Sequence, residues 1–159
     1  MADPNSPESL TQSRDVENIA RTLAQPVIAL NVATDGEIDA AFSTMRQQNV
    51  NAFFACGSPF FNTRSHRFAN LASTHKIPGM YSNRNYVNAG GLISYGAGIP
   101  EAYYQAGLYV GRIIKGARPG DLPVLQPVKF ELVINLKSAK ALGLDLPDRL
   151  MALTDDVVE

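Results

Sequence analysis

The chain has 159 residues, of which 45% are hydrophobic and 18% charged, and its formal net charge at pH 7 is −1. This composition is typical of a folded globular domain and excludes a disordered chain. A charge near zero, without blocks of one sign, offers no basic surface for nucleic acid or for an anionic membrane. Arg64, His66 and Arg67 form the densest basic cluster, which is more typical of a solvated helix face than of a phosphate site.

The single cysteine, Cys56, excludes an internal disulfide and a cysteine-based metal cage. It ends an apolar run, which favours a buried thiol over a catalytic thiolate. The polar first nine residues lack the basic and apolar regions of a signal peptide. No segment approaches the ~20 apolar residues of a membrane span. Taken literally, the chain is therefore predicted to be cytoplasmic, an expectation that fails if the sequence is a piece of a longer protein, and no cofactor is predicted.

The first half of the chain alternates predicted helices and strands. In chain order we expect a helix at residues 8–23, a strand at 26–32, a helix capped by Thr34 or Asp35, a strand from 50 or 51 to 56, and a helix at 59–76. The first helix would bury Val16, Ile19, Ala20 and Leu23, which recur at helical spacing. Asp3, Pro4 and Asn5, just before it, look like the loop that normally leaves a strand.

The second half continues this alternation with shorter elements. We expect a strand at residues 77–81, a turn or short helix at 83–91, a strand at 92–95, a helix at 99–115, an extended connector at 117–127, a strand at 130–136, and short helices at 138–142 and 147–153, with Asp155 and Asp156 in the tail. Strands of four to seven residues separated by helices predict an α/β fold with a mostly parallel sheet.

The long helix at residues 99–115 carries two apolar faces. One holds Ala106, Val110 and Ile113, and the other holds Tyr103, Gly107 and Ile114. A helix that is apolar on two sides needs to be covered on two sides, so we expect a partner for this helix.

Enzyme signatures are absent from the sequence. The glycines follow neither common phosphate-loop spacing, and no two histidines stand four residues apart. Asp35, Glu37 and Asp39 cluster at a predicted helix N-terminus, where the helix dipole accounts for them. The sequence therefore predicts no catalytic residues and no metal site.

Three loops that follow predicted strands hold polar and aromatic side chains instead. In open parallel sheets, ligands bind at the carboxyl ends of the strands. The first loop holds Ser58, Phe60 and Asn62; Ser58 is either a ligand contact or a helix N-cap, and Phe60 either stacks on a ligand or joins the core.

The second loop holds Ser82 and Arg84, which suit an anionic ligand group or a solvated surface. Tyr95, at the end of the next strand, is either a cleft residue or a core tyrosine.

Several stretches of the chain resemble a family of bacterial ABC-transporter substrate-binding proteins, of the type I periplasmic binding protein kind. The similar stretches are residues 37–42, 58–62, 90–96, 104–116, 121–124, 129–137 and 139–144.

The resemblance implies two Rossmann-like lobes, each a three-layer sandwich, with a solute between them. By the family's pattern, residues 8–89 and 128–159 form most of a second lobe, and residues 90–127 form the hinge and a segment that packs on the first lobe, which is largely absent. The implied role is non-catalytic binding of a small molecule such as an amino acid by Ser58, Phe60, Asn62, Ser82, Arg84 and Tyr95.

The implied partners are ABC permease subunits, and the implied location is periplasmic or extracytoplasmic, although this chain shows no signal peptide. Without a first lobe, we expect self-association through the exposed face of the long helix, which holds Tyr103, Gly107 and Ile114. A ligand-sensing regulatory domain of the same fold is the alternative, and a flavodoxin-like enzyme or phospho-acceptor domain ranks below both.

Overall fold

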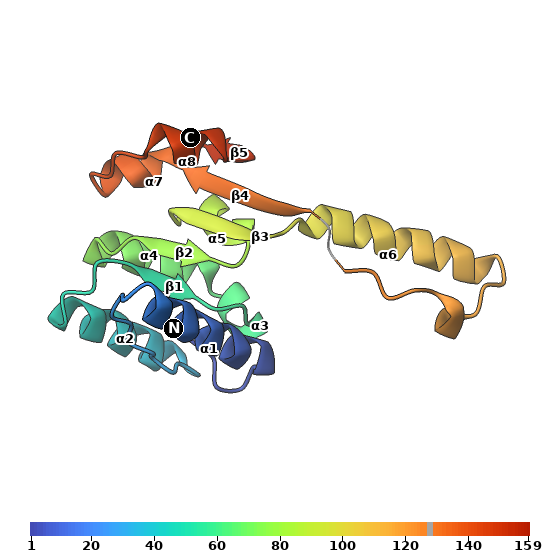
Figure 1. The fold of residues 1–159 in the computed structure, drawn as a ribbon, viewed down its shortest axis with the longest axis horizontal. Coiled ribbons are helices and arrows are strands. Elements are labelled where there is room, and N and C mark those ends of the chain that lie inside the picture. Colours follow the sequence, from blue (N-terminus) through green and yellow to red (C-terminus); the bar gives the residue numbers. More distant parts are fainter. Residues whose placement is uncertain (127–128) are drawn as a thin grey trace.

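The computed structural model describes residues 1–126 and 129–159, and it shows an α/β fold built on a mostly parallel sheet (Figure 1). The strands are β1 (Phe53–Ala55), β2 (Gly79–Tyr81), β3 (Ile93–Ala97), β4 (Phe130–Asn135) and β5 (Asp156–Val158), in that spatial order. The pairs β1–β2, β2–β3 and β4–β5 are parallel, and only β3–β4 is antiparallel. The predicted fold class is confirmed.

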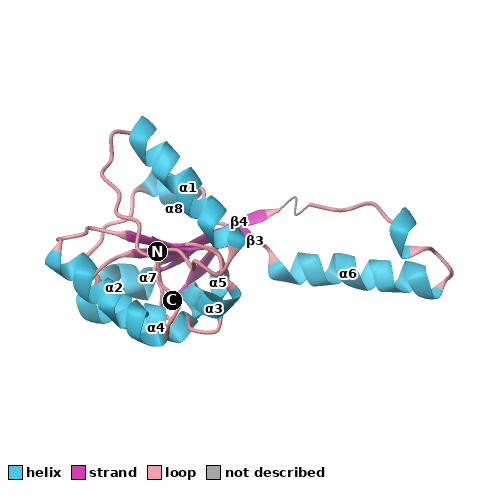
Figure 2. Ribbon diagram, turned by 90° about the horizontal axis from the view of Figure 1, so that it is seen from below, coloured by secondary structure: helices cyan, strands magenta, loops and turns pink. Residues whose placement is uncertain are grey.

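Helices cover both faces of this sheet. They are α1 (Pro7–Thr22), α2 (Asp35–Gln47), α3 (Pro59–Asn62), α4 (Ser65–His75), α5 (Arg84–Asn88), α6 (Ile99–Ile114), α7 (Leu136–Ala141) and α8 (Asp148–Ala152), with a 3₁₀ turn η1 (Pro119–Asp121). Figure 2 shows α1 on one face of the sheet and α2 and α4 on the other. The arrangement is a three-layer sandwich, as the family resemblance implies.

The main core lies between the sheet and the layer of α2 and α4. Phe42 of α2 is fully buried, and its ring centroid lies 5.1 Å from that of Phe53 and 6.2 Å from that of Phe68. Phe61 extends the cluster with a centroid 5.0 Å from Phe68. Edge-on and tilted aromatic contacts of this kind add to the stability that burial of the rings provides. Cys56 is also buried, as predicted, and burial raises the pKa of its thiol.

The start of α2 follows the predicted capping chemistry. The Thr34 hydroxyl accepts a hydrogen bond from the Glu37 backbone N–H at 3.3 Å, and the Glu37 carboxylate accepts one from the Thr34 N–H at 3.1 Å. This reciprocal capping box satisfies backbone donors that would otherwise lack partners at the helix N-terminus. Thr34 rather than Asp35 is therefore the N-cap.

The predicted strand at residues 26–32 is wrong. Among residues 1–126 and 129–159, its only ladder contact is an isolated bridge between Ala2 and Asn31. In this bridge the Ala2 N–H donates to the Leu30 carbonyl and the Val32 N–H donates to the Ala2 carbonyl, each at 2.9 Å. On its other side, the N-terminal segment receives a hydrogen bond from the Cys56 N–H to the Met1 carbonyl at 3.0 Å. Residues 1–3, called the N-terminal ribbon below, therefore lie between residues 30–32 and β1.

The predicted inward face of the first helix is only partly confirmed. Ala20 is buried, but Ile19 is 59% exposed and Leu23 is 63% exposed. The segment that follows the helix pairs with the sheet only near Asn31, so the sheet beneath this end of α1 offers little surface to cover these side chains.

Two further expectations need correction. The single helix predicted at residues 59–76 is two helices, because Arg64 leaves helical geometry (φ −118°, ψ 19°). The tail holding Asp155 and Asp156, for which no element was predicted, contains a strand: the Asp155 carboxylate accepts the Leu132 N–H at 2.8 Å, and β5 begins at the next residue. This strand depends on contacts with β4, which no local sequence pattern reveals.

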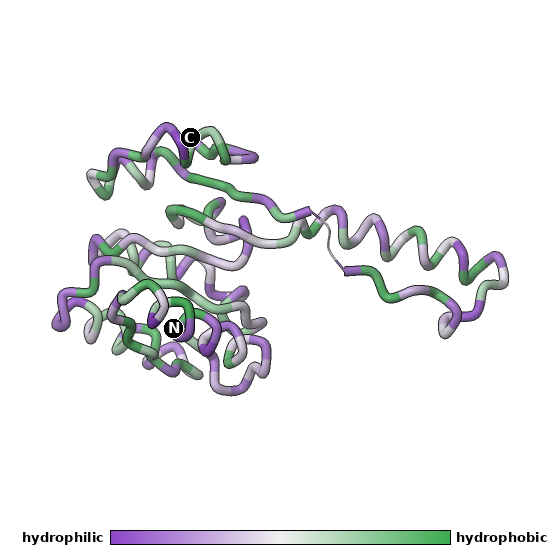
Figure 3. Tube along the Cα trace, viewed as in Figure 1, coloured by the Kyte–Doolittle hydropathy of each residue, from purple (hydrophilic) through white to green (hydrophobic). Residues whose placement is uncertain are grey.

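The long helix α6 projects from the sheet as an arm, with residues 117–126 running back beside it (Figure 1). No residue of α6 is buried, and Tyr103 and Ile114 are 76% and 80% exposed. Figure 3 shows hydrophobic residues at intervals along this arm. The helix was predicted correctly, and within the described ranges neither apolar face is fully covered. None of the helices in residues 1–126 and 129–159 is both long and apolar enough to cross a membrane.

Replacing Phe42 by alanine tests the position of the core. Because its ring is fully buried among aromatic neighbours, Phe42→Ala should lower the free energy of unfolding by about 3–5 kcal/mol. Val124→Ala is the matched control, since Val124 is 96% exposed, and its effect should stay within about 0.5 kcal/mol. Urea denaturation measures both, and equal effects of the two substitutions would contradict this core.

Candidate functional site

Loops from neighbouring parallel strands meet at one edge of the sheet, at the carboxyl ends of β1 and β2. Ser58 follows β1 and begins α3, and Arg84 follows β2 and begins α5. The N-terminal ribbon runs parallel to residues 30–32, so Asp3 leaves the sheet at the same edge. Backbone topology thus gathers polar side chains from distant parts of the sequence, as in other open α/β sheets.

Ser58 is buried and links two of these loops. Its hydroxyl accepts the backbone N–H groups of Phe60 at 3.1 Å and Phe61 at 3.4 Å, which makes it the N-cap of α3. The same hydroxyl donates to the Asp3 carboxylate at 2.5 Å. Ser58 is therefore a cap that also holds Asp3, which is itself only 4% exposed.

Asp3 is a site residue that sequence reasoning missed. Its backbone N–H donates to the Ser9 hydroxyl at 2.8 Å, and its carboxylate accepts the Asn5 N–H at 2.9 Å. The only sequence signal was the resemblance of residues 3–5 to a loop that leaves a strand, which indicated the turn but not the contact with Ser58.

Asn62 connects the α3 loop to the loop after β2. Its side-chain carbonyl accepts hydrogen bonds from the Asn83 amide at 2.8 Å and from the Tyr86 hydroxyl at 3.2 Å. Asn62 is exposed, whereas Tyr86 is buried and stacks on Tyr81 with ring centroids 4.5 Å apart. The exposed amide is thus held in place by buried aromatic rings.

Arg84 lies among carboxylates. Its guanidinium pairs with Asp156 at 2.6 Å and approaches Glu131 at 3.8 Å. The hydrogen bond from Arg84 holds the pKa of Asp156 below its ordinary value. An anionic ligand group at this position would compete with these two acids for the guanidinium.

Ser82 directly follows β2, and Tyr95 lies on the adjacent strand β3, at the same edge. A Cβ atom on Gly96 would lie 1.9 Å from the Ser82 carbonyl oxygen, so only glycine permits this close approach. Ser82 itself is half-buried. Tyr95, next to Gly96, is 51% exposed and stacks on Phe130 with ring centroids 5.7 Å apart. Tyr95 is therefore a surface aromatic residue and not a core tyrosine.

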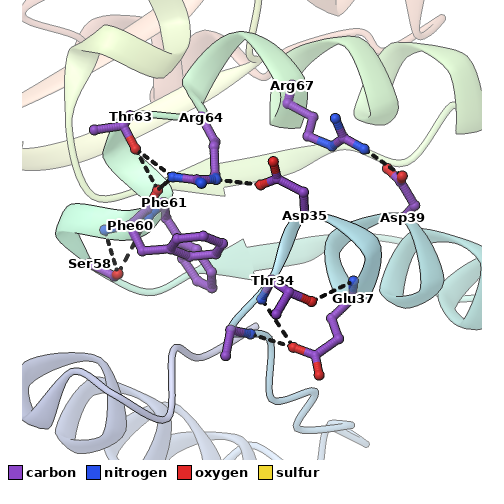
Figure 4. Close-up of polar contacts among 11 residues, drawn as sticks. Thr34, Asp35, Glu37, Asp39, Ser58, Phe60, Phe61, Thr63, Arg64 and Arg67 are labelled. Carbon is purple, nitrogen blue, oxygen red and sulfur yellow. Dashed lines mark hydrogen bonds and ion pairs between the residues drawn. The ribbon is translucent and has the colours of Figure 1, made fainter.

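Phe60 lies beside the basic cluster that the sequence singled out (Figure 4). The ring is half-buried against the core, and the Arg64 guanidinium carbon lies 3.9 Å from its centroid. Arg64 also forms an ion pair with Asp35, and Arg67 forms one with Asp39 at 2.5 Å. These pairs join the start of α4 to α2, and both arginine side chains are partly exposed, as expected for a solvated surface rather than a phosphate site.

All six predicted site residues lie near this edge, but they do not form one enclosed pocket. Two grooves of the structure lie elsewhere. One, of about 410 Å³, lies between α6 and residues 125–126 and 129; the other, of about 610 Å³, lies beside Met1. Within the described ranges, His, Cys, Asp and Glu side chains form no group of three or more that would hold a metal ion.

The ion pair of Arg84 gives a testable pH dependence. Because the folded-state pKa of Asp156 is depressed, this pair stabilises the fold above the ordinary carboxyl pKa of 3.8, and that contribution is lost as the pH falls through the depressed value. Arg84→Gln should return the pKa of Asp156 toward 3.8, as measured by NMR titration of its side-chain carboxyl carbon. Asp35, whose partner is Arg64, is the internal control, and a pKa of Asp156 that stays unchanged in the variant would contradict the pairing.

Known proteins of similar sequence and structure include substrate-binding proteins. The family model described as "ABC transporter substrate binding protein" matches residues 4–158. A tyrosine-binding protein from Clostridioides difficile is 23% identical over 136 residues, which are 86% of this chain and 39% of that protein.

Solved structures of similar fold are about twice as long as this chain. An ABC domain from Streptococcus pneumonia in complex with L-Trp superposes with a TM-score of 0.86 at 23% identity, covering 99% of this chain and 54% of the other. A conserved domain protein from Vibrio cholerae gives a TM-score of 0.87 at 19% identity, over 98% and 52% of the two chains. The ligand-free, open structure of a Clostridium difficile substrate binding protein with adhesive properties gives 0.70 at 19%, over 99% and 52%. With a family match over nearly its whole length and these neighbours in structure, this chain belongs to the ABC transporter substrate-binding protein family.

Proposed function

We propose that this chain supplies one wall of a solute-binding cleft in an ABC import system. The observation that carries the proposal is the family match over residues 4–158, because that family consists of solute-binding proteins. The polar edge at the carboxyl ends of β1 and β2 lies where ligands bind in open parallel sheets. Binding is reversible, and no covalent step is involved.

The proposed ligand is an amino acid, with an aromatic side chain as the first candidate. Two of the similar proteins are described as tyrosine-binding and as a complex with L-Trp. The site edge offers matching chemistry: the exposed ring of Tyr95 for stacking, the Asn62 amide for hydrogen bonding and the Arg84 guanidinium for a carboxylate.

The six residues play different parts in this proposal. Asn62, Arg84 and Tyr95 are partly or fully accessible and contact the solute directly, and Phe60 adds an apolar surface. Ser58 is buried, so it acts by capping α3 and by holding the Asp3 carboxylate in place. Ser82 contributes through its backbone, which packs against Gly96.

Closure of the cleft requires an opposite wall. We assign residues 8–89 and 128–159 to the second lobe, and residues 90–127 to the hinge and a segment that packs on the first lobe; the boundary at 127–128 lies outside the described residues. The exposed α6 arm supports this division, because its apolar side chains need a cover. In this role the protein works outside the cytoplasm and delivers its solute to ABC permease subunits.

Titration with amino acids tests the ligand class. Adding L-tyrosine, L-tryptophan or L-phenylalanine should shift the backbone amide NMR signals of Asn62, Arg84 and Tyr95, whereas D-ribose should not. Tyr95→Ala should weaken binding roughly threefold to tenfold, because an aromatic contact contributes about 0.5–1.5 kcal/mol. Tyr104→Ala is the matched control, since Tyr104 is an exposed tyrosine on α6, outside both the polar edge and the face that holds Tyr103. The absence of shifts with any amino acid at millimolar concentration would contradict the proposed ligand.

Self-association is the second part of the proposal. The face of α6 that holds Tyr103, Gly107 and Ile114 is open, and a Cβ on Gly107 would meet nothing within 4 Å. Burying exposed apolar side chains of this kind is favourable by about 25 cal/mol per Å². A second copy of the chain would provide a matching apolar surface.

Sedimentation velocity measures this association. The chain should form dimers or larger species at micromolar concentration, and Ile114→Glu should shift the population toward monomer by placing a charge in the interface. Val124→Glu, at a site 96% exposed and off the helix, should have no such effect. A stable monomer of the unmodified chain at micromolar concentration would count against self-association.

A further inference from the structure

Glu131 lies at the polar edge beside Arg84, although it was not among the predicted site residues. In the antiparallel pair of β3 and β4 it stands opposite Gly96. Asp156 pairs in register with Val133, two residues along β4 from Glu131, so the two acidic side chains point to the same face of the sheet. Arg84 reaches both carboxylates from the start of α5.

The Glu131 carboxylate is partly withdrawn from water and accepts no hydrogen bond within residues 1–126 and 129–159. Its side chain is 23% exposed. The cations paired with it are the Arg84 guanidinium at 3.8 Å and the Lys129 ammonium at 3.7 Å, both beyond hydrogen-bond distance. An ionised carboxylate has about four acceptor sites, and polar groups withdrawn from water are normally hydrogen-bonded. Glu131 therefore has the capacity to accept a donor from outside the chain.

Arg84 keeps donors for a further partner. A guanidinium carries five N–H donors, and in the part of the chain that the structure describes this arginine donates only from Nη2, to Asp156 at 2.6 Å. The Arg84 side chain is 35% exposed. Nη1, on the side of Glu131, is available to a planar carboxylate. A donor and an acceptor of opposite charge thus stand side by side at the polar edge.

Two glycines flank the Glu131 carboxylate. Gly96 is its register partner on β3, and a Cβ atom on Gly98 would lie 3.2 Å from Glu131 Oε1, which is tighter than most side-chain contacts. Because glycine has no side chain, neither position covers the carboxylate.

We propose that Glu131 and Arg84 together hold the two charges of an α-amino acid, with the ammonium group of the solute on Glu131 and its carboxylate on Arg84. This inference rests on the proposed function and adds the residue that selects amino acids from other solutes. The two charged groups of an α-amino acid are joined to one carbon atom, so neighbouring protein groups of opposite charge can bind both. A solute with a carboxylate alone leaves Glu131 without a donor and places a second negative charge beside it.

Analogues of phenylalanine test the assignment, because 3-phenylpropanoate lacks the ammonium group and phenethylamine lacks the carboxylate. In NMR titrations of the backbone amides, L-phenylalanine should bind at least about fivefold more tightly than either analogue, the factor that a partly exposed ion pair contributes. Glu131→Gln keeps the size of the side chain and removes its charge. In this variant the affinities for phenylalanine and 3-phenylpropanoate should lie within about twofold of each other.

Asp156→Asn is the matched control. It removes the other carboxylate beside Arg84, which already has the guanidinium as its donor. Release of the guanidinium should tighten the binding of phenylalanine and of 3-phenylpropanoate by the same factor, so the ratio of the two affinities should not change. A ratio that falls in Asp156→Asn but not in Glu131→Gln would overturn the assignment to Glu131.

A failure of this inference is distinguishable from a failure of the proposed function. If the unmodified chain binds phenylalanine and 3-phenylpropanoate equally well, amino-acid binding is supported and the role of Glu131 is wrong, whatever the variants show. If none of the three compounds shifts an amide signal at millimolar concentration, the proposed function is contradicted and the role of Glu131 with it.

Discussion

The hydrogen bond between Ser58 and Asp3 holds the candidate site together. It joins residues 55 positions apart in the chain, and both partners are buried at the edge where the parallel strands end. Through it, the N-terminal ribbon is tied to the loop after β1, and the same hydroxyl caps α3. A buried polar pair of this kind is costly to leave unpaired, so it fixes the position of both loops. Asn62, one of the accessible side chains that we assign to solute binding, ends the helix that Ser58 caps and so depends on this support.

The apolar side chains of this fold are buried unevenly. The face of the sheet under α2 and α4 has a dense aromatic core, whereas the other face, under α1, leaves apolar side chains open and borders the groove beside Met1. The α6 arm, whose residues are all at least partly exposed, is the second open region. Both regions expose apolar side chains. Solved structures that share this fold are about twice as long as this chain, and a further segment or a partner could cover each of the two regions.

Local sequence patterns predicted much of this fold and part of the site. Thr34 and Glu37 mark the start of α2, and the apolar runs around Phe53 and Ile93 indicate strands. Such signals can be recognised in the sequence because capping and strand formation here depend on residues only a few positions apart. The run at residues 26–32 has the composition of a buried strand but pairs only at Asn31, since pairing depends on how far the neighbouring ribbon reaches.

Contacts between residues distant in sequence also limited what could be predicted about the site. The loops were identified from their residue types, but the partners of Ser58 and Arg84 lie 55 and 72 positions away. Because of these long separations, the sequence did not show that Asp3 binds the Ser58 hydroxyl. Nor did it show that Asp156 would compete with a ligand for the Arg84 guanidinium.

A crystal structure of the chain grown with L-tyrosine or L-tryptophan tests the central claim most directly. The account predicts electron density for the amino acid against Asn62, Arg84 and Tyr95, with the Ser58–Asp3 hydrogen bond intact behind it. Density confined to the groove beside Met1 or to the α6 arm, with the polar edge empty, would contradict it.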